Sequence, residues 1–496
     1  EPGGTGTGKP VDVVDPVWSV ASTNVDTGVV KLRVKDKYLT KSTSKFNLAK
    51  ESIKIIVNGV ESTAIVKTLE GPTTITDGQE YEYTLTLSNI APSGGGYTEF
   101  TPLETIVGGT AKYRNDNGGS ITIRIPAGAV TDANGNKTKQ QDLNVGNMDL
   151  TEPEVYFVQK NRDLANNQET IIFNVTDKNY DSTKLIAANE LTTWVDGTQM
   201  DSKLTKSISS KTISTRIDGS TRVVGHQYTL VLKGFAESDS AFASSGRVYR
   251  EYSGNLQVKI NKDAARDKRG NTLNSSTTTI AQFTDVVRPD IKAKWSDAVI
   301  NKNNKTFTMI FDITDKYYAS SSLAIGDLTI KIGGKTPDWS SNEVGRSLSV
   351  SDIPGAAGKG KRYTLTLSNL QKLQIKSGDK YLDYSGVVTV VVPAGRVEDT
   401  TGNTNLAKTI TSGITIPGGT GSEKEVDVVE PYVQKMSSSV NAVAKTASIT
   451  VRISDRYFAN STLTKDTIKV LINGTENSAV KTGWSTSEET ESRTEK

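Results

Sequence analysis

The sequence predicts an all-β protein made of antiparallel β-sandwich repeats that follow one another along the chain. Two observations lead to this fold class: the composition favours strands and turns, and the same short motifs recur at a regular interval. Threonine, serine, valine, glycine and asparagine dominate, and 35% of the residues are hydrophobic, as expected for short, half-buried strands joined by polar turns. A chain of 496 residues is too long for one core, so several domains are expected.

The repeats are delimited by an Asp-x-x-x-Pro motif that occurs four times. Its aspartates are 137, 136 and 142 residues apart, and they are Asp12, Asp149, Asp285 and Asp427. Each motif precedes an alternating stretch that ends in an aspartate and, two or three positions later, a tyrosine; these aspartates are Asp36, Asp177, Asp315 and Asp455. We therefore predict a linker at 1–11, repeats at 12–148, 149–284 and 285–426, the third ending in a glycine-rich linker, and a partial repeat at 427–496.

Turn residues recur at the same phase in each repeat. A hairpin signal, in which both central residues must accept positive φ, is found at Asn58-Gly59, Asp196-Gly197, Gly333-Gly334 and Asn473-Gly474. Alternating Tyr-x-Leu-x-Leu strands follow at Tyr83, Tyr228 and Tyr363, and Asp-x-x-Gly-Asn turns follow at Asp132, Asp267 and Asp399. About seven strands per repeat with such punctuation are typical of a sandwich.

The fourth repeat reaches Lys496 before its Tyr-x-Leu-x-Leu strand. Half a sandwich would leave sheet edges open. Two interpretations are compatible with the pattern: the sequence is a window on a longer protein, or another chain donates the missing strand.

Composition and motifs exclude several classes of function. The net charge is +3, with no basic stripe interleaved with aromatic residues, so nucleic acid is not an expected partner. Cysteine is absent, which excludes disulfides and thiolate sites. No stretch approaches the roughly 18 apolar residues of a membrane helix, so we expect no membrane span in this segment. Nucleophile elbows, phosphate loops and zinc-protease motifs are missing, and His226 is the single histidine, so we expect no enzyme.

The motifs resemble the Ig-like repeats of bacterial surface adhesins and surface-layer proteins. The resemblance rests on the Asp-x-x-x-Pro opening, on Tyr-Thr-Leu-Thr-Leu-Ser-Asn at 83–89 and 363–369, and on Ile-Pro-Ala-Gly-Ala-Val-Thr-Asp-Ala-Asn-Gly-Asn at 125–136. The second copy of the last motif departs from it at 260–265. The resemblance implies Ig-like sandwiches stacked into an elongated rod at the bacterial cell surface, an extracellular location.

The resemblance also implies a function. We expect the repeat region of a surface-layer, filament or adhesin stalk, with neighbouring repeats or copies of the chain itself as partners. The alternative is an adhesive module, in which the long loops of one repeat recognise a host glycan or protein.

An Ig-like sandwich would bring the recurring acidic positions of a repeat to one pole, beside the preceding linker. The candidate metal ligands are Asp12, Asp15, Asp36 and Asp132 in the first repeat, and Asp149, Glu152, Asp177 and Asp267 in the second. Clustered carboxylates are what Ca²⁺ needs, with six to eight oxygens at roughly 2.3–2.6 Å. We predict Ca²⁺ at the repeat junctions as a candidate ion; no other cofactor is expected.

A competing interpretation stays open for the same aspartates. An aspartate in an Asp-x-x-Gly-Asn turn often accepts hydrogen bonds from its own turn, while the glycine supplies positive φ. In addition, the third repeat has Arg288 where the others have an acid, which a uniform calcium site would not favour.

Overall fold

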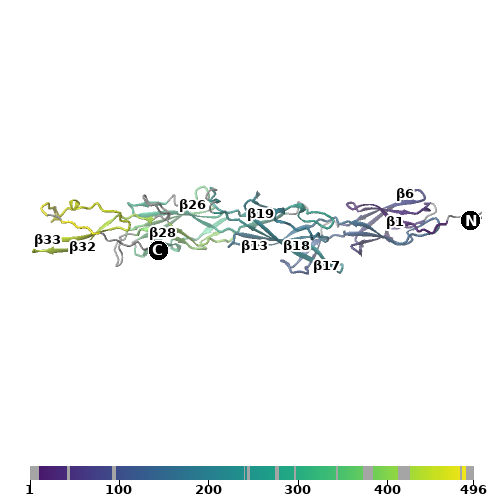
Figure 1. Cartoon of the computed structure of the whole chain (residues 1–496), viewed down its shortest axis with the longest axis horizontal. Coiled ribbons are helices and arrows are strands. Elements are labelled where there is room, and N and C mark those ends of the chain that lie inside the picture. The colour runs from purple at the N-terminus through teal and green to yellow at the C-terminus, as the bar shows by residue number, and fades with distance from the viewer. Residues whose placement is uncertain are drawn as a thin grey trace, which may run out of the picture. The chain divides into compact units, whose positions relative to one another are not determined.

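The computed structural model describes residues 11–41, 45–91, 96–238, 241–242, 246–273, 279–294, 298–341, 344–371, 384–411, 425–480 and 483–487. The chain divides into two compact units, Glu1–Arg288 and Pro289–Lys496 (Figure 1). Nearly all of the linker predicted at 1–11 and the glycine-rich linker before residue 425 lie outside the described residues. The described sheets are antiparallel throughout, which confirms the all-β prediction. Below, segments 1 to 4 are the stretches 12–148, 149–284, 285–426 and 427–496.

Two four-stranded sheets enclose the core of segment 1, in the orders β1-β2-β7-β6 and β12-β10-β4-β5. Side chains alternate on β2, where Val30, Leu32 and Val34 are buried against the facing sheet, as period-2 strands require. The strands are β1 Val17–Asn24, β2 Val29–Lys35, β3 Lys45–Phe46, β4 Lys54–Val57, β5 Val60–Glu61, β6 Val66–Thr76, β7 Glu80–Ser88, β8 Tyr97–Phe100, β9 Ala111–Arg114, β10 Ser120–Ile125, β11 Val130–Thr131 and β12 Gln141–Asn147.

Segment 2 has the same plan, with sheets in the orders β13-β14-β18-β17 and β16-β15-β19-β20 around a core of its own. Its β17–β18 ribbon is long: 13 and 14 residues, against 11 and 9 in β6 and β7. The strands are β13 Glu154–Asp163, β14 Gln168–Thr176, β15 Leu191–Val195, β16 Thr198–Gln199, β17 Thr205–Ile217, β18 Ser220–Lys233, β19 Gly254–Ile260 and β20 Thr279–Thr284.

In the second unit, segment 3 forms one sheet in the order β21-β23-β27-β26, with β22 beside β23, and one in the order β25-β28-β30, with β31 beside β28. Both contribute to one core. The strands are β21 Asp290–Ala293, β22 Val299–Asn301, β23 Thr306–Thr314, β24 Tyr318–Ser321, β25 Thr329–Ile332, β26 Gly345–Asp352, β27 Gly360–Ser368, β28 Gly386–Val392, β29 Val397–Asp399, β30 Lys408–Thr411 and β31 Glu425–Val426.

Segment 4 contains two hairpins, and several of its apolar side chains are exposed. Ile449 and Val451, six and four residues before Asp455, are 67% and 40% exposed, whereas Val30 and Leu32, at the same distances before Asp36, are fully buried. The strands are β32 Tyr432–Asn441, β33 Thr446–Ser454, β34 Leu471–Ile472 and β35 Thr475–Glu476.

The predicted hairpin turns are confirmed. Both central residues have positive φ in each of the four, for example 52° and 88° at Asn58 and Gly59, and 47° and 79° at Asp196 and Gly197. The described residues also contain five short 3-10 helices: Lys50–Ser52, Ala188–Glu190, Lys262–Ala264, Ile325–Asp327 and Lys465–Thr467.

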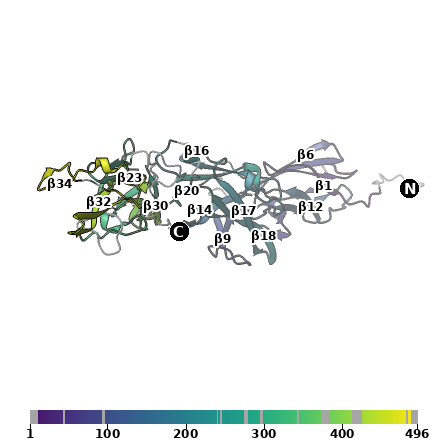
Figure 2. The ribbon, with the colours of Figure 1, turned by 60° about the vertical axis from the view of Figure 1, so that its left-hand side comes forward.

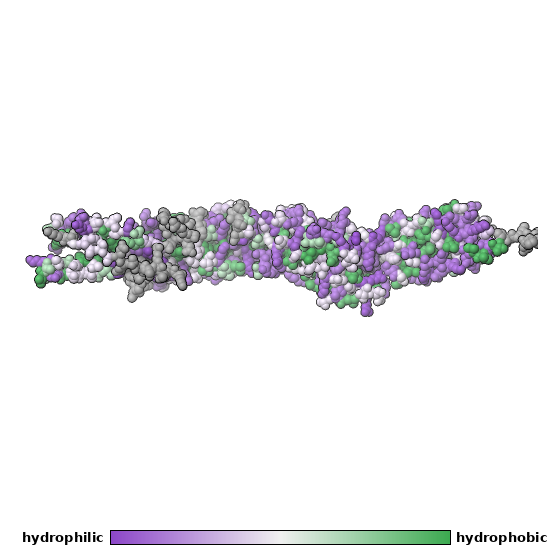
Figure 3. Space-filling model, viewed as in Figure 1, coloured by the Kyte–Doolittle hydropathy of each residue, from purple (hydrophilic) through white to green (hydrophobic). Residues whose placement is uncertain are grey.

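Hydrophilic side chains cover most of the face seen in Figure 3, with smaller apolar areas between them. Among the exposed apolar residues are Val11, Val13 and Val14, just ahead of β1. Within the described part of the chain, no helix has the length and apolar character needed to cross a membrane.

Candidate functional site

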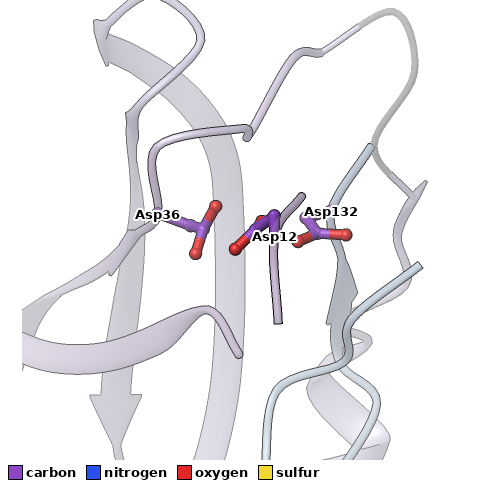
Figure 4. A group of neighbouring side chains, drawn as sticks. All are labelled: Asp12, Asp36 and Asp132. Carbon is purple, nitrogen blue, oxygen red and sulfur yellow. The ribbon is translucent and has the colours of Figure 1, made fainter. Parts of the chain in front are cut away.

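Three of the predicted aspartates of segment 1 converge. Asp12 precedes β1, Asp36 follows β2 and Asp132 follows β11, and one carboxylate oxygen of each lies within 4.8 Å of the others (Figure 4). Asp12 and Asp36 are half-buried and Asp132 is buried. Burial, reinforced by the charges of Asp12 and Asp132, raises the pKa of Asp36.

The Asp-x-x-Gly-Asn turn determines where Asp132 points. Its Oδ1 accepts hydrogen bonds from the backbone N–H groups of Asn134 and Asn136, both over 2.8 Å. The side-chain amide of Asn136 donates to Asp132 Oδ2 over 2.9 Å and to the carbonyl oxygen of Asp12 over 3.1 Å. The turn-capping interpretation is therefore correct, and the same turn also holds the linker that brings Asp12 to the cluster.

Segment 2 repeats this arrangement in a more buried form. Carboxylate oxygens of Asp149, Asp177 and Asp267 lie within 4.8 Å of one another, and the three residues are 0%, 2% and 1% exposed. Asp267 Oδ1 accepts backbone hydrogen bonds from its turn, including one of 2.8 Å from Asn271, whose amide reaches the carbonyl oxygen of Asp149 over 2.9 Å. We call these three residues, together with Asp116, the junction carboxylates.

Asp116, which the sequence did not predict, comes from segment 1. It is 5% exposed and follows β9 in the long loop between β7 and β10. Asn179 connects it to segment 2, since Asn179 Nδ2 lies 3.3 Å from Asp116 Oδ2 and 2.8 Å from Asp149 Oδ2. Asp116 Oδ1 accepts the N–H of Gly118 over 2.7 Å. The cluster therefore lies at the junction of the two segments.

The junction carboxylates have little positive charge to balance them. Among the described residues, no lysine or arginine forms an ion pair with any of the four; Lys178 donates to the carbonyl oxygen of Asp116 over 2.7 Å, and Arg269 to that of Asp149, also over 2.7 Å. Burial, and then the charge of Asp149, raises the pKa of Asp116 to about 7. The same two causes raise the pKa of Asp177 well above its ordinary value and also raise that of Asp267.

The donor set fits a hard divalent cation. Buried carboxylates that lack a protein cation either hold protons or bind a metal ion, and oxygen ligands of this kind suit Ca²⁺. Asp177 Oδ1 accepts the N–H of Asn179 over 2.6 Å, which leaves its second oxygen for an ion. Asp149, Asp177 and Asp267, whose carboxylate oxygens converge, would hold the ion, with Asp116 beside them. The ion would neutralise charge that otherwise opposes docking of the segments.

The remaining two predicted ligands lie outside the clusters. Asp15 pairs with Lys139 over 3.2 Å, in the same segment as Asp12. Glu152 lies near Arg114. Burial lowers the pKa of Arg114, but the charge of Glu154, 3.5 Å away, and then that of Glu152 contribute to a net increase. Both acids therefore interact with basic side chains in place of the clusters.

Hydrogen bonds join segment 1 to segment 2 around the junction carboxylates. The backbone N–H of Lys112, on β9, donates to the hydroxyl of Tyr156 over 2.8 Å, and its carbonyl oxygen accepts the hydroxyl of Thr176 over 2.6 Å. Arg269 forms an ion pair with Asp26, on the turn between β1 and β2. The first two segments therefore contact each other through hydrogen bonds and an ion pair.

No model of a known protein family matches the sequence, and no curated protein matches it either.

Proposed function

We propose that this chain is a structural part of an extracellular bacterial surface protein: a row of Ig-like repeats that forms an elongated, non-enzymatic rod, as in a surface-layer, filament or adhesin stalk. The observation that carries the proposal is the junction of segments 1 and 2, where side chains of both segments surround four buried carboxylates. A buried junction transmits orientation from one repeat to the next, whereas a polar flexible linker would not.

The long loop of segment 1 favours the structural role over the adhesive alternative. Loops of this length are where a binding function is expected, but several residues of this loop contact segment 2. Lys112 and Asp116 on it contact Tyr156, Thr176 and Asn179 of segment 2. Its residues therefore stabilise the junction.

We propose further that Ca²⁺ binds the junction carboxylates and stiffens the junction. The support is their burial, the raised pKa of Asp116, Asp177 and Asp267, and the absence of ion pairs to them among the described residues. Asp12, Asp36 and Asp132 form a second, more exposed candidate site, for which we expect weaker binding because fewer carboxylates contribute.

Small-angle scattering of the full chain and antibody labelling of intact source cells test the structural role. We expect scattering from an elongated particle, and labelling of cells without permeabilisation. A compact particle, or labelling only after the cells are opened, would contradict the proposal.

Calorimetry of the full chain tests the ion. We expect Ca²⁺ to raise the unfolding temperature of the first unit relative to chelator, by linkage of folding to binding. The response should be lost in Asp149→Asn with Asp177→Asn and kept in Asp142→Asn, because Asp142 pairs with Arg124 over 2.7 Å outside the cluster. Identical scans with Ca²⁺ and chelator would contradict the proposed calcium site but not the proposed structural role.

A further inference from the structure

A hairpin of segment 1 packs onto segment 2 beside the junction carboxylates. The hairpin consists of β8, β9 and the loop between them, residues 97–114, and it lies against the β17–β18 ribbon; Figure 2 shows β9 next to these strands. One cluster of buried side chains combines both sides: Ile106, Ala111 and Tyr113 from the hairpin, and Ile213, Ile217 and Val224 from the ribbon. The partly buried Phe100 of the hairpin packs against this cluster. We call this contact the clasp.

The apolar part of the clasp belongs to neither sandwich core. Ile213, Ile217 and Val224 are 0%, 8% and 0% exposed, but they belong to a cluster separate from the core of segment 2. Their burial depends on the hairpin of segment 1. If the two segments separated, all three side chains would be exposed to water, which disfavours separation in proportion to the apolar area involved.

Polar contacts give the clasp a fixed register. The N–H of Leu103 donates to the carbonyl oxygen of Ser214 over 2.9 Å, and the N–H of Ser214 donates to the carboxylate of Glu104. The side-chain amide of Gln227 both accepts from the N–H of Val107 over 2.8 Å and donates to its carbonyl oxygen over 2.9 Å. Paired hydrogen bonds of this kind permit one docking position.

The clasp is also continuous with the junction carboxylates. Asp116 lies two residues after the end of β9, and Asp177 directly follows β14. The N–H of Asp177 donates over 2.9 Å to the carbonyl oxygen of Val224, a member of the clasp. Displacing the hairpin would therefore move Asp116 away from Asp149 and Asp177.

We propose that the clasp makes segments 1 and 2 one cooperative folding and force-bearing unit. Unfolding either segment exposes the clasp residues of the other and removes its polar partners, so the second segment loses stability when the first unfolds. This inference goes beyond the proposed function, and it requires no bound ion. The lengthened β17–β18 ribbon supplies the docking surface, which the shorter β6–β7 ribbon of segment 1 does not match.

Pulling the full chain from its ends in chelator, in a single-molecule force experiment, tests the clasp. We expect one step that releases both segments, roughly 1,000 Å of contour length at about 3.6 Å per residue. In Phe100→Ser with Ile106→Ser, this step should separate into two of about half that length. Both residues lie outside the two sandwich cores, and circular dichroism checks that the variant remains folded.

Leu103→Ser is the matched control, because the Leu103 side chain is 56% exposed although it lies in the same hairpin. It should keep the single step. Two separate steps in the unaltered chain, or a single step in the double variant, would overturn the proposal. Because calcium is absent from this experiment, its result is independent of whether the junction carboxylates bind the ion.

Discussion

Asn179 donates its side-chain amide to Asp149 over 2.8 Å, and the same nitrogen lies 3.3 Å from Asp116. One amide group therefore connects a carboxylate of segment 2 with a carboxylate of segment 1. Asn179 is 7% exposed, so water does not readily replace it. Of the side chains described at the junction, Asn179 is the neutral donor that two carboxylates share.

Asn179→Leu should destabilise the first unit. The substitution keeps most of the volume but removes both donors, and a buried acceptor left without its donor costs about 1–3 kcal/mol. Urea unfolding in chelator measures the loss. Asn255→Leu, at an exposed position of β19, is the control and should change the free energy of unfolding by less than about 0.5 kcal/mol. Equal effects of the two substitutions would mean that the amide of Asn179 does not stabilise the junction.

The sequence predicted the features that recur in several segments, but not those that occur in one segment. The alternation on β2 and β27, the four hairpin turns and both aspartate triads follow from motifs in register, because a strand of period 2 and a two-residue turn are local properties. Asp116 and the clasp depend on the long loop of segment 1. No repeated motif aligns with this loop, so the sequence did not indicate which residues it contacts.

The sequence does distinguish the position of Asn179 from the corresponding positions of segments 1 and 3. Segment 2 reads Asp-Lys-Asn-Tyr where segments 1 and 3 read Asp-Lys-Tyr. The extra residue is the one that reaches the two carboxylates, and comparison of the repeats would have singled it out. Its partners, however, are 30 and 63 residues away in the sequence, and only the tertiary structure identifies them.

Two substitutions of Asp267 separate its role in the turn from its charge. Asp267→Asn keeps an oxygen acceptor for the backbone N–H groups of Arg269, Gly270 and Asn271 but removes a charge from the cluster. The introduced amide nitrogen faces the side-chain amide of Asn271, which donates to Asp267 Oδ2 over 2.6 Å, so one hydrogen bond is lost. In chelator the unfolding temperature should therefore fall less than in Asp267→Ala, and the response to Ca²⁺ should fall. Asp267→Ala loses the acceptor as well, at a cost of about 1–3 kcal/mol. Calorimetry distinguishes the two; equal losses in chelator would mean that the carboxylate charge itself stabilises the turn.

Stability without calcium should fall as the pH rises from 5 to 8. Burial raises the pKa of Asp116 to about 7, above an unfolded value of about 4, so the folded state holds a proton that the unfolded state releases. The stabilisation is complete below the unfolded pKa and is lost as the pH rises through the folded pKa; for Asp116 it amounts to about 2–3 kcal/mol at pH 5.

Asp116→Asn isolates this contribution. The difference in free energy of unfolding between the unaltered chain and the variant, measured by urea unfolding in chelator at several pH values, should change by that amount between pH 5 and 8. The difference cancels titrating groups outside the cluster, such as His226, whose pKa is lowered by burial. A difference that is constant with pH would show that Asp116 is ionised across the range.

Gly225→Ala should destabilise segment 2 strongly. Gly225 on β18 pairs with Thr176 on β14, and an added Cβ would lie 2.2 Å from the carbonyl oxygen of Val175 and 2.7 Å from Thr176 Cγ2. Because the first contact is with backbone, β18 must move away from β14, which also disturbs the hydrogen bond from Asp177 to Val224. We expect a loss of more than about 2 kcal/mol and a weaker response to Ca²⁺.

Gly219→Ala, at the tip of the same ribbon, is the control. Gly219 has a φ of 77°, and no atom lies within 4 Å of the added Cβ. The substitution should therefore cost only the backbone strain of about 1–2 kcal/mol and leave the response to Ca²⁺ unchanged. Urea unfolding of both variants, with and without Ca²⁺, measures the two effects, and a larger loss in Gly219→Ala would contradict the close approach of β14 and β18 beneath the junction.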